Sequence, residues 1–241
     1  LTEISPGIFY GLAERGGTNN DGTLFEYNLN TSTFTKKIDF ELDTTGENPN
    51  VNLFLASNVN LYGSLQDGPL GEGTIFEYLP GATDVQVVVD FEKALSGAQP
   101  QEQLAVGPNG KIYGTTFQKG SNNQGTLFEF DPVTEVFTLL HDFTTDAQGE
   151  QLEGPLVIIG DMVYGVASEG GSVNGSVENG TLFSYNLTTN TFNVEYTFDN
   201  STGRNPGIGL ILSSQWTLIG NTFNGGPDGG GVLYEYDVNT G

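Results

Sequence analysis

The chain has no cysteine, a single histidine and very few basic residues. Without cysteine no disulfide can hold the fold. This absence does not indicate the cellular compartment, because chains without cysteine occur both inside and outside cells. Only 7 lysines and arginines stand against 30 acids, which gives a net charge of −23. No positive stripe can form, so we expect no nucleic-acid binding and no attraction to anionic membrane surfaces. No apolar run approaches the ~20 residues of a membrane span, so we expect no membrane insertion.

Helical amphipathic periodicity is also absent, whereas glycine is abundant, with 35 residues. Apolar residues instead alternate with polar ones over short runs rich in Phe, Tyr, Val and Ile. Clusters of Gly, Asn, Thr and Ser separate these runs. A spacing of two with turn-forming residues in between predicts β-strands, and the regular apolar content argues against disorder.

One stretch recurs five times with the pattern Gly-Thr-Leu-Phe-Glu-Tyr or a close variant of it. Its copies begin at Gly22, Gly73, Gly125, Gly180 and Gly231. Successive copies are 51, 52, 55 and 51 residues apart. A fixed period near fifty residues predicts a repeat architecture, in which each unit needs its neighbours to bury its faces.

Each repeat holds four apolar runs, of which the recurring stretch is the third. In the second repeat, run one is Leu53–Ser57, run two ends at Gly63 and run four ends at Asp90 and Phe91. Four antiparallel strands of this length are typical of a β-propeller blade. We therefore predict one all-β propeller domain, 1–241, of ~51-residue blades. The blade boundaries are expected at about 1–48, 49–99, 100–150, 151–204 and 205–241, with the fifth blade incomplete.

The second and third runs carry a family resemblance. Tyr-Gly-Thr-Thr at 113–116, followed by a Gly-rich loop and Gly-Thr-Leu-Phe at 125–128, resembles the GloVer tandem repeat. That family occurs on large secreted bacterial proteins with interchangeable C-terminal anchors. The resemblance implies kelch-like propeller blades, secretion and a cell-surface role, and it implies no active site. Because the chain starts at Leu1 and not at methionine, we also expect it to be a piece of a longer protein.

The lone histidine and the recurring glutamate invite a catalytic interpretation, and a structural role is favoured for both. His141, the lone histidine, has too few companions for a triad or a histidine metal site, and we expect it at the surface or at a sheet edge. The glutamate of run three recurs at the same place in different blades, so we expect it to accept hydrogen bonds from a neighbouring blade. Its copies are Glu26, Glu77, Glu129 and Glu235. The phenylalanine that ends run four should cap the core between blades, and the preceding aspartate should bind backbone amides of the following turn.

The binding surface is predicted from loop lengths. The loops between runs two and three, and those after run four, are long and should lie on the same side of an up-and-down blade. Variable loops on a rigid scaffold are where ligands usually bind. The predicted ligand-binding residues are Asn19, Asn20, Asp21, Asp67, Glu72, Asn122, Asn123, Asn174 and Asp228, together with the segment around Glu47. Among them, Asp21 and Asp228 are also candidate ligands for calcium, and no other cofactor is expected.

The leading functional hypothesis is a secreted or surface-anchored adhesion module that binds a glycan or a protein without catalysis. Two alternatives stay open: a carbohydrate-active enzyme on a five-bladed propeller, and a structural spacer or filament subunit. A further expectation concerns 231–237. With run four absent after it, this strand would leave a free edge. We expect further chain, either past Gly241 or before Leu1, to complete the edge, and the next alternative is a strand added by another molecule.

Overall fold

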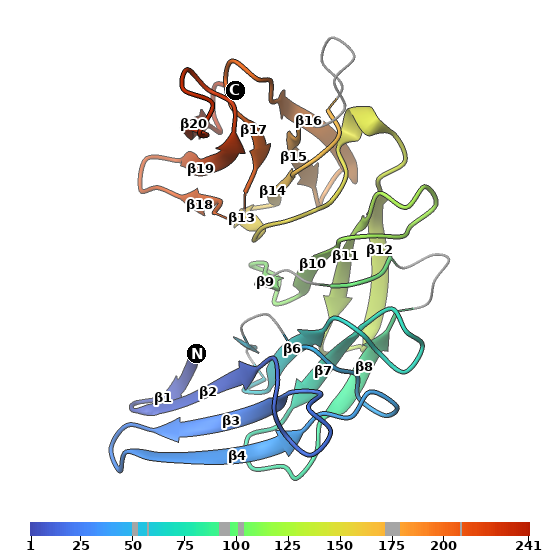
Figure 1. The fold of residues 1–241 in the computed structure, drawn as a ribbon, viewed down its shortest axis with the longest axis vertical. Helices are drawn as coiled ribbons and strands as arrows, with labels where there is room; N and C mark the ends of the chain where they lie inside the picture. Colours follow the sequence, from blue (N-terminus) through green and yellow to red (C-terminus); the bar gives the residue numbers. More distant parts are fainter. Residues whose placement is uncertain (50–52, 57, 92–96, 101–103, 172–178, 208) are drawn as a thin grey trace.

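The computed structural model describes the chain except for residues 50–52, 57, 92–96, 101–103, 172–178 and 208. The described residues form twenty β-strands, one 3-10 turn at Asp146–Gln148 and no α-helix. The strands make five four-stranded antiparallel sheets, here called blades 1 to 5, which follow one another along an open arc (Figure 1). The predicted all-β architecture of propeller blades is confirmed. Within the described part of the chain, no helix has the length and apolarity needed to cross a membrane.

The strands follow chain order within each of the first four blades. Blade 1 contains β1 (Thr2–Ser5), β2 (Ile8–Ala13), β3 (Thr23–Asn28) and β4 (Thr33–Asp39). Blade 2 contains β5 (Phe54–Leu55), β6 (Leu61–Leu65), β7 (Thr74–Tyr78) and β8 (Gln86–Asp90). Blade 3 contains β9 (Ala105–Val106), β10 (Ile112–Thr116), β11 (Thr126–Asp131) and β12 (Val136–Asp142). Blade 4 contains β13 (Val157–Ile159), β14 (Met162–Ala167), β15 (Thr181–Asn186) and β16 (Thr191–Thr197).

Blade 5 differs from the others because, among the described residues, no fourth strand lies beside its third strand. It contains β18 (Ile211–Leu212), β19 (Thr217–Asn224) and β20 (Leu233–Asp237), while β17 (Arg204–Pro206) pairs with the far end of β19. Among the described residues, β20 therefore has one strand neighbour, β19. The fifth repeat is incomplete, as the sequence predicts.

The short first strands lie on the concave side of the arc (Figure 1), where β1 contacts β5 and β9 contacts β13. Run one is thus innermost, which confirms the predicted order of strands. Each recurring glycine directly precedes the third strand of its blade, or in blade 5 precedes it by two residues. The sequence period is therefore a structural period.

The glycine that ends run two faces the aromatic residue of run three across the sheet. In blade 2, Gly63 pairs with Phe76, and a Cβ on Gly63 would lie 2.6 Å from Phe76 Cζ and 3.2 Å from Leu53 Cδ2. The ring thus lies directly over the glycine, which explains why no side chain is tolerated there. The other copies of the pair are Gly11 with Phe25, Gly114 with Phe128, Gly165 with Phe183 and Gly220 with Tyr234.

The hydrophobic core is divided among the spaces between blades. Each of the four clusters takes its buried residues from two consecutive blades; the first joins Leu24 and Phe40 of blade 1 to Leu61 and Phe76 of blade 2. The rings of Phe40 and Phe76 have centroids 5.2 Å apart. The phenylalanine that ends run four is at most 2% exposed in every blade that has it: Phe40, Phe91, Phe143 and Phe198. Burying such a side chain contributes roughly 1.5–3 kcal/mol, so each blade depends on its neighbour.

His141 lies in β12, the outer edge strand of blade 3, in line with the expected surface or edge position, although it is not fully exposed. Its ring is half-buried and stacks on Phe192 of the next blade, with centroids 3.9 Å apart and parallel planes. Burial lowers the pKa of His141, while the adjacent Asp142 raises it to a smaller extent. The sequence of repeat three does not reveal that a residue of repeat four covers this position.

Candidate functional site

The long loops of one side meet in pairs at the junctions between blades. At the first junction, Glu47 of the segment after β4 forms a backbone bridge with Asp67 of the loop after β6. The corresponding bridge at the third junction joins Glu150 to Glu169. The bridge at the second junction joins Ala98 to Gln118, and at the fourth β17 pairs with β19. The two sets of loops therefore form one surface, here called the loop face.

A contact between the recurring glycine and the next repeat holds these loops in place. Gly22 has φ +105°, and a Cβ there would lie 2.5 Å from Pro49 Cδ of the following repeat. Asn48, the residue before that proline, has φ +58° and donates its backbone N–H to the Asp21 carbonyl over 3.1 Å. The same glycine–proline contact recurs for Gly73 with Pro100 and Gly180 with Pro206. Three of the four junctions are thus fixed by backbone geometry that glycine adopts most freely.

The first junction brings together two of the predicted binding residues. Asp21 accepts a 3.0 Å hydrogen bond from the Leu42 amide, and Asp67 accepts a 3.1 Å bond from Asn48 Nδ2. Glu47 lies between these two acids. Its pKa is raised by burial first, and then by the negative charges of Asp21 and Asp67. Three carboxylates therefore share one half-buried spot on the loop face.

The other predicted residues are spread over the remaining junctions. Glu72 is buried, and its backbone carbonyl accepts the Gln99 amide over 2.8 Å at the second junction. Asn122 is exposed and donates its Nδ2 to the Thr144 carbonyl at the third. Asn19, Asn20, Asn123 and Asp228 are exposed in their loops, and Asn174 lies outside the described residues. The structure therefore groups the predicted residues by junction and does not gather them in one pocket.

A second acidic cluster, which the sequence did not indicate, lies at the third junction. The pKa of Glu150 is raised by burial and then by the charges of Asp146 and Glu169. The pKa of Glu153 is raised by burial and by Glu169. Gln124 donates to Asp146 over 2.8 Å, so this cluster also receives an amide donor. Its members lie in the segment after run four and in a loop of the next repeat, and their proximity depends on the pairing of those segments.

The aspartate that ends run four helps to shape the same loops. Asp142 accepts two 3.1 Å hydrogen bonds from the Ser121 amide, one to each carboxylate oxygen. In blade 1, Asp39 accepts from Thr18 Oγ1 over 3.1 Å. The expected bond to the following turn is therefore replaced by bonds to the loop before run three. These carboxylates are structural parts of the loop face.

Three of the four repeated glutamates, Glu26, Glu77 and Glu129, are at least partly buried within their blades, whereas Glu235 is exposed. Glu129 accepts a 2.7 Å hydrogen bond from Tyr113, and Glu26 accepts a 2.6 Å bond from Tyr10; in each pair both residues belong to one blade. The donor is thus the facing tyrosine of run two and not a group of a neighbouring blade, which corrects the expectation. A strand register that places the two residues opposite each other explains the pairing.

The two candidate calcium ligands belong to separate loops. Asp21 lies in a loop of blade 1 and Asp228 in a loop of blade 5, at the two ends of the arc (Figure 1). In the described ranges of the chain, no group of three or more His, Cys, Asp or Glu side chains could hold a metal ion.

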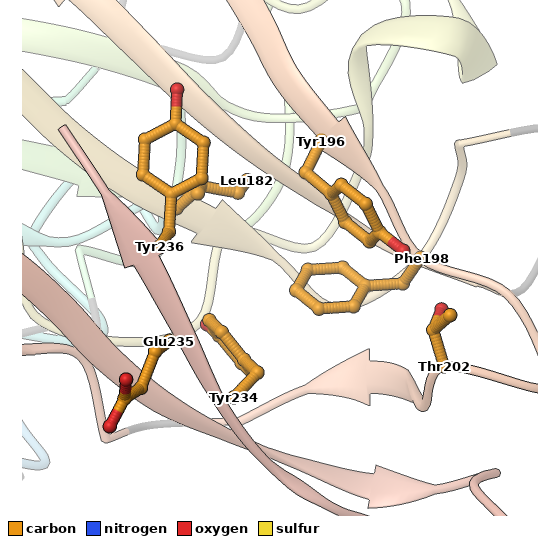
Figure 2. A pocket seen from close by; sticks show the side chains of 7 residues that line it. All are labelled: Leu182, Tyr196, Phe198, Thr202, Tyr234, Glu235 and Tyr236. Carbon is orange, nitrogen blue, oxygen red and sulfur yellow. The ribbon is translucent and has the colours of Figure 1, made fainter. Parts of the chain in front are cut away.

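A pocket of about 210 Å³ lies between the outer strands of blades 4 and 5. Tyr196 and Phe198 come from β16 and its end, whereas Tyr234 and Tyr236 come from β20 (Figure 2). The rings of Phe198 and Tyr234 have centroids 4.9 Å apart. Leu182, Thr202 and Glu235 complete the lining. Sequence reasoning did not identify this pocket.

The fold resembles several solved structures of low sequence identity. One is the extracellular domain of a B. thetaiotaomicron protein described as a one component system, with a TM-score of 0.62 and 16% identity over 92% of this chain. Another is TolB from Acinetobacter baumannii, with a TM-score of 0.56 and 12% sequence identity over 98% of this chain. A third is a chain of the nidogen–laminin complex, with a TM-score of 0.54 and 12% sequence identity over 96% of this chain. At such identities the likeness concerns the fold alone.

The chain covers 25%, 51% and 74% of those three proteins, respectively, and so spans a quarter of the first and about half of the second. No curated protein matches it. The family model of the Gloeobacter/Verrucomicrobia repeat, in contrast, matches residues 1–178, which contain the first three recurring stretches. The chain belongs to the Gloeobacter/Verrucomicrobia repeat family.

Proposed function

We propose that this repeat protein is a non-catalytic binding module whose loop face holds a glycan or a protein ligand. The observation that carries the proposal is the pairing of the two loop sets into one surface, with a carboxylate cluster at each of two junctions. Half-buried carboxylates and exposed amides accept and donate hydrogen bonds to sugar hydroxyls or to a peptide backbone. The opposite side of the blades has only short turns.

The charge of the chain limits which ligands it can bind. With a net charge of −23, an anionic ligand would be repelled, so the ligand is neutral or basic. We place the module outside the cell, attached to its surface, in line with the fold it shares with an extracellular domain and with the implication of the repeat family. Adhesion between a cell and its surroundings is the role that fits a rigid scaffold with variable loops.

A glycan array and a set of basic and neutral protein ligands, probed with the purified chain, test the proposal. The matched variants are Asp21→Asn with Asp67→Asn on the loop face, and Glu135→Gln on the short-turn side. Asparagine keeps an oxygen that accepts the Leu42 and Asn48 hydrogen bonds, so the fold should persist. Binding should fall by about tenfold in the first variant and stay unchanged in the second.

The same sample separates the alternatives. Each bound glycan is incubated with the chain and examined by mass spectrometry for cleavage. Cleavage would favour a carbohydrate-active enzyme over an adhesion module. Absence of any ligand, together with filaments in electron micrographs, would favour a spacer or filament subunit.

A further inference from the structure

The backbone bridge at each of the four junctions sets two side chains opposite each other, and these pairs differ in charge. In order along the chain they are Glu47 with Asp67, Ala98 with Gln118, Glu150 with Glu169, and Arg204 with Asn224. Side chains of directly opposed residues in an antiparallel pair lie on the same face. The bridge also forms where alanine or arginine takes the place of the glutamate, so it requires no carboxylate. Pairing of the segments therefore does not explain the two acids at the third junction.

At the third junction the opposed acids work against folding. Glu150 and Glu169 exchange both backbone hydrogen bonds, over 3.0 and 3.1 Å, which holds their side chains next to each other. Like charges in this position are destabilising. Burial, and then the charges of Asp146 and Glu169, raise the pKa of Glu150. This junction therefore carries negative charge that the fold does not neutralise.

Among the described residues, the carboxylates of the third junction outnumber the donors that reach them. Gln151 Nε2 donates to Glu169 over 2.6 Å, and Gln124 Nε2 donates to Asp146 over 2.8 Å. Glu150 and Glu153 are half-buried, and in the described part of the chain neither side chain accepts a hydrogen bond or forms an ion pair. The third-junction cluster is defined as Asp146, Glu150, Glu153 and Glu169, together with Gln124.

A buried amide oxygen of the same cluster also lacks a donor. Gln124 is 7% exposed, and its Nε2 holds it against Asp146, so its Oε1 lies at the cluster too. Oε1 is buried, and no group in the described ranges donates a hydrogen bond to it. This observation is independent of the charges, because the amide is neutral. An unpaired amide oxygen beside unpaired carboxylates indicates a ligand that is positively charged and donates several hydrogen bonds.

A guanidinium group has both properties. It is always charged, and its planar arrangement of five N–H donors binds carboxylates with two parallel hydrogen bonds. A metal ion fits less well, because no group of three or more His, Cys, Asp or Glu side chains among the described residues could hold one. The first junction is a weaker candidate than the third, since Asp21 there accepts the Leu42 amide and also contacts the Glu47 side chain.

We propose that the third-junction cluster binds an arginine side chain of a protein ligand. This inference rests on the binding function proposed for the loop face, and it favours a protein over a glycan as the ligand. The guanidinium donates to the carboxylates of Glu150 and Glu153 and to Gln124 Oε1. Its charge relieves the repulsion between Glu150 and Glu169. The oxygens of Asp146 and Glu169 that already accept amide donors keep those hydrogen bonds.

The test titrates the 241-residue chain with a short peptide of glycines around one arginine, blocked at both ends. NMR spectra of the backbone amides measure the affinity and locate the site. The control peptide carries citrulline, which has nearly the shape of arginine and no charge. The arginine peptide should shift the amide signals of 150–153 and 169 and should bind about tenfold more tightly than the citrulline peptide. Equal binding of the two peptides would overturn the proposal, and so would binding of calcium at this cluster in preference to the arginine peptide.

Glu150→Gln removes one charge and keeps the shape of the side chain. It should weaken binding of the arginine peptide by about tenfold while the Tm stays the same or rises, because the repulsion at the bridge is also removed. Glu135→Gln, which removes one charge from the short-turn side, is the matched control and should bind the peptide as the original chain does. An equal loss of binding in both variants would show that only the net charge matters and would exclude a site at the third junction.

Failure of this site and failure of the loop-face function give different results. If the glycan array and the protein set yield no ligand while the arginine peptide binds at 150–153, the loop-face function is wrong and this site stands. If a ligand is found and Glu150→Gln binds it as tightly as the original chain does, the loop-face function stands and this site is wrong.

Discussion

Tyr113 and Glu129 face each other across β10 and β11, and the Tyr113 hydroxyl donates a 2.7 Å hydrogen bond to the Glu129 carboxylate. Both side chains are buried, at 0% and 9% exposure. Lys111 adds a second contact to the carboxylate, at 2.6 Å. Burial raises the pKa of Tyr113, and the hydrogen bond to Glu129 raises it further. A buried charge that is paired in this way is a structural element of the blade.

Tyr113→Phe should lower the free energy of unfolding by about 1–3 kcal/mol, because Glu129 loses a buried donor. Urea denaturation measures the change. Tyr164→Phe in blade 4 is the matched control, since Tyr164 faces Ser184 where the other blades have a glutamate. Tyr164→Phe should lower the free energy of unfolding by less than Tyr113→Phe does. Equal losses in the two variants would show that the tyrosine–glutamate bond contributes little.

Gly63→Ala should destabilise the chain by about 1–3 kcal/mol, because the new methyl group would overlap the buried Phe76 ring. Gly230→Ala is the control, since a Cβ there meets no atom within 4 Å. Thermal denaturation of both variants measures the difference. A neutral Gly63→Ala would mean that the ring moves aside easily and that the glycine is not required for packing.

His141 should make stability fall as the solution becomes acidic. Its pKa is lowered by burial in the folded chain, so the unfolded chain binds the proton more tightly. The contribution of neutral His141 is complete above its unfolded pKa of about 6.5 and is lost as pH falls from there through the lowered folded pKa. His141→Phe keeps the stacked ring and removes the titration. The stability difference between the variant and the original chain should therefore grow as pH falls from about 7.5 to about 5. A constant difference over this range would contradict the assignment.

The acidic cluster around Glu150 should give the opposite dependence of stability on pH, with stability rising as the solution becomes acidic. The folded-state pKa of Glu150 is raised by burial and by Asp146 and Glu169, so its charge opposes folding at neutral pH. That penalty disappears as pH falls through the folded pKa, because the proton then neutralises the carboxylate. Glu150→Gln should raise the Tm at neutral pH by on the order of 1 °C, and the gain should vanish at acidic pH. Glu135→Gln, at an exposed turn, is the control and should leave the Tm unchanged at both neutral and acidic pH. A stabilisation that persists in acid would exclude charge as its cause.

The repeat period was sufficient to predict the blades, the order of their strands and the missing fourth strand of blade 5. The reason is that each feature is repeated locally: Gly63 and Phe76 pair in blade 2 as Gly11 and Phe25 do in blade 1. Local chemistry also predicted that Phe91 would be buried between blades. These features need only the residues of one repeat and the rule that blades stack.

The site was less predictable, since it is made by contacts between repeats. The cluster of Glu150 and Glu169 depends on which two segments bridge at the junction. Likewise, Tyr196 gave no sign of lining a pocket, since its counterpart His141 is covered by the next blade and Tyr196 is not. Tyr113 was not recognised as the donor to Glu129, because cross-strand register requires the bulge-free pairing of β10 and β11. Sequence spacing alone does not give these relationships.

The central claim is that a ligand binds on the loop face, and hydrogen exchange of the chain with and without a ligand from the array tests it most directly. The account predicts that protection concentrates in the loops 16–22, 66–73, 117–125 and 225–231 and in the segments that bridge to them. The short turns at 6–7, 29–32, 109–110 and 160–161 on the other side should exchange as before. Protection confined to those short turns, with the loops unaffected, would contradict the account.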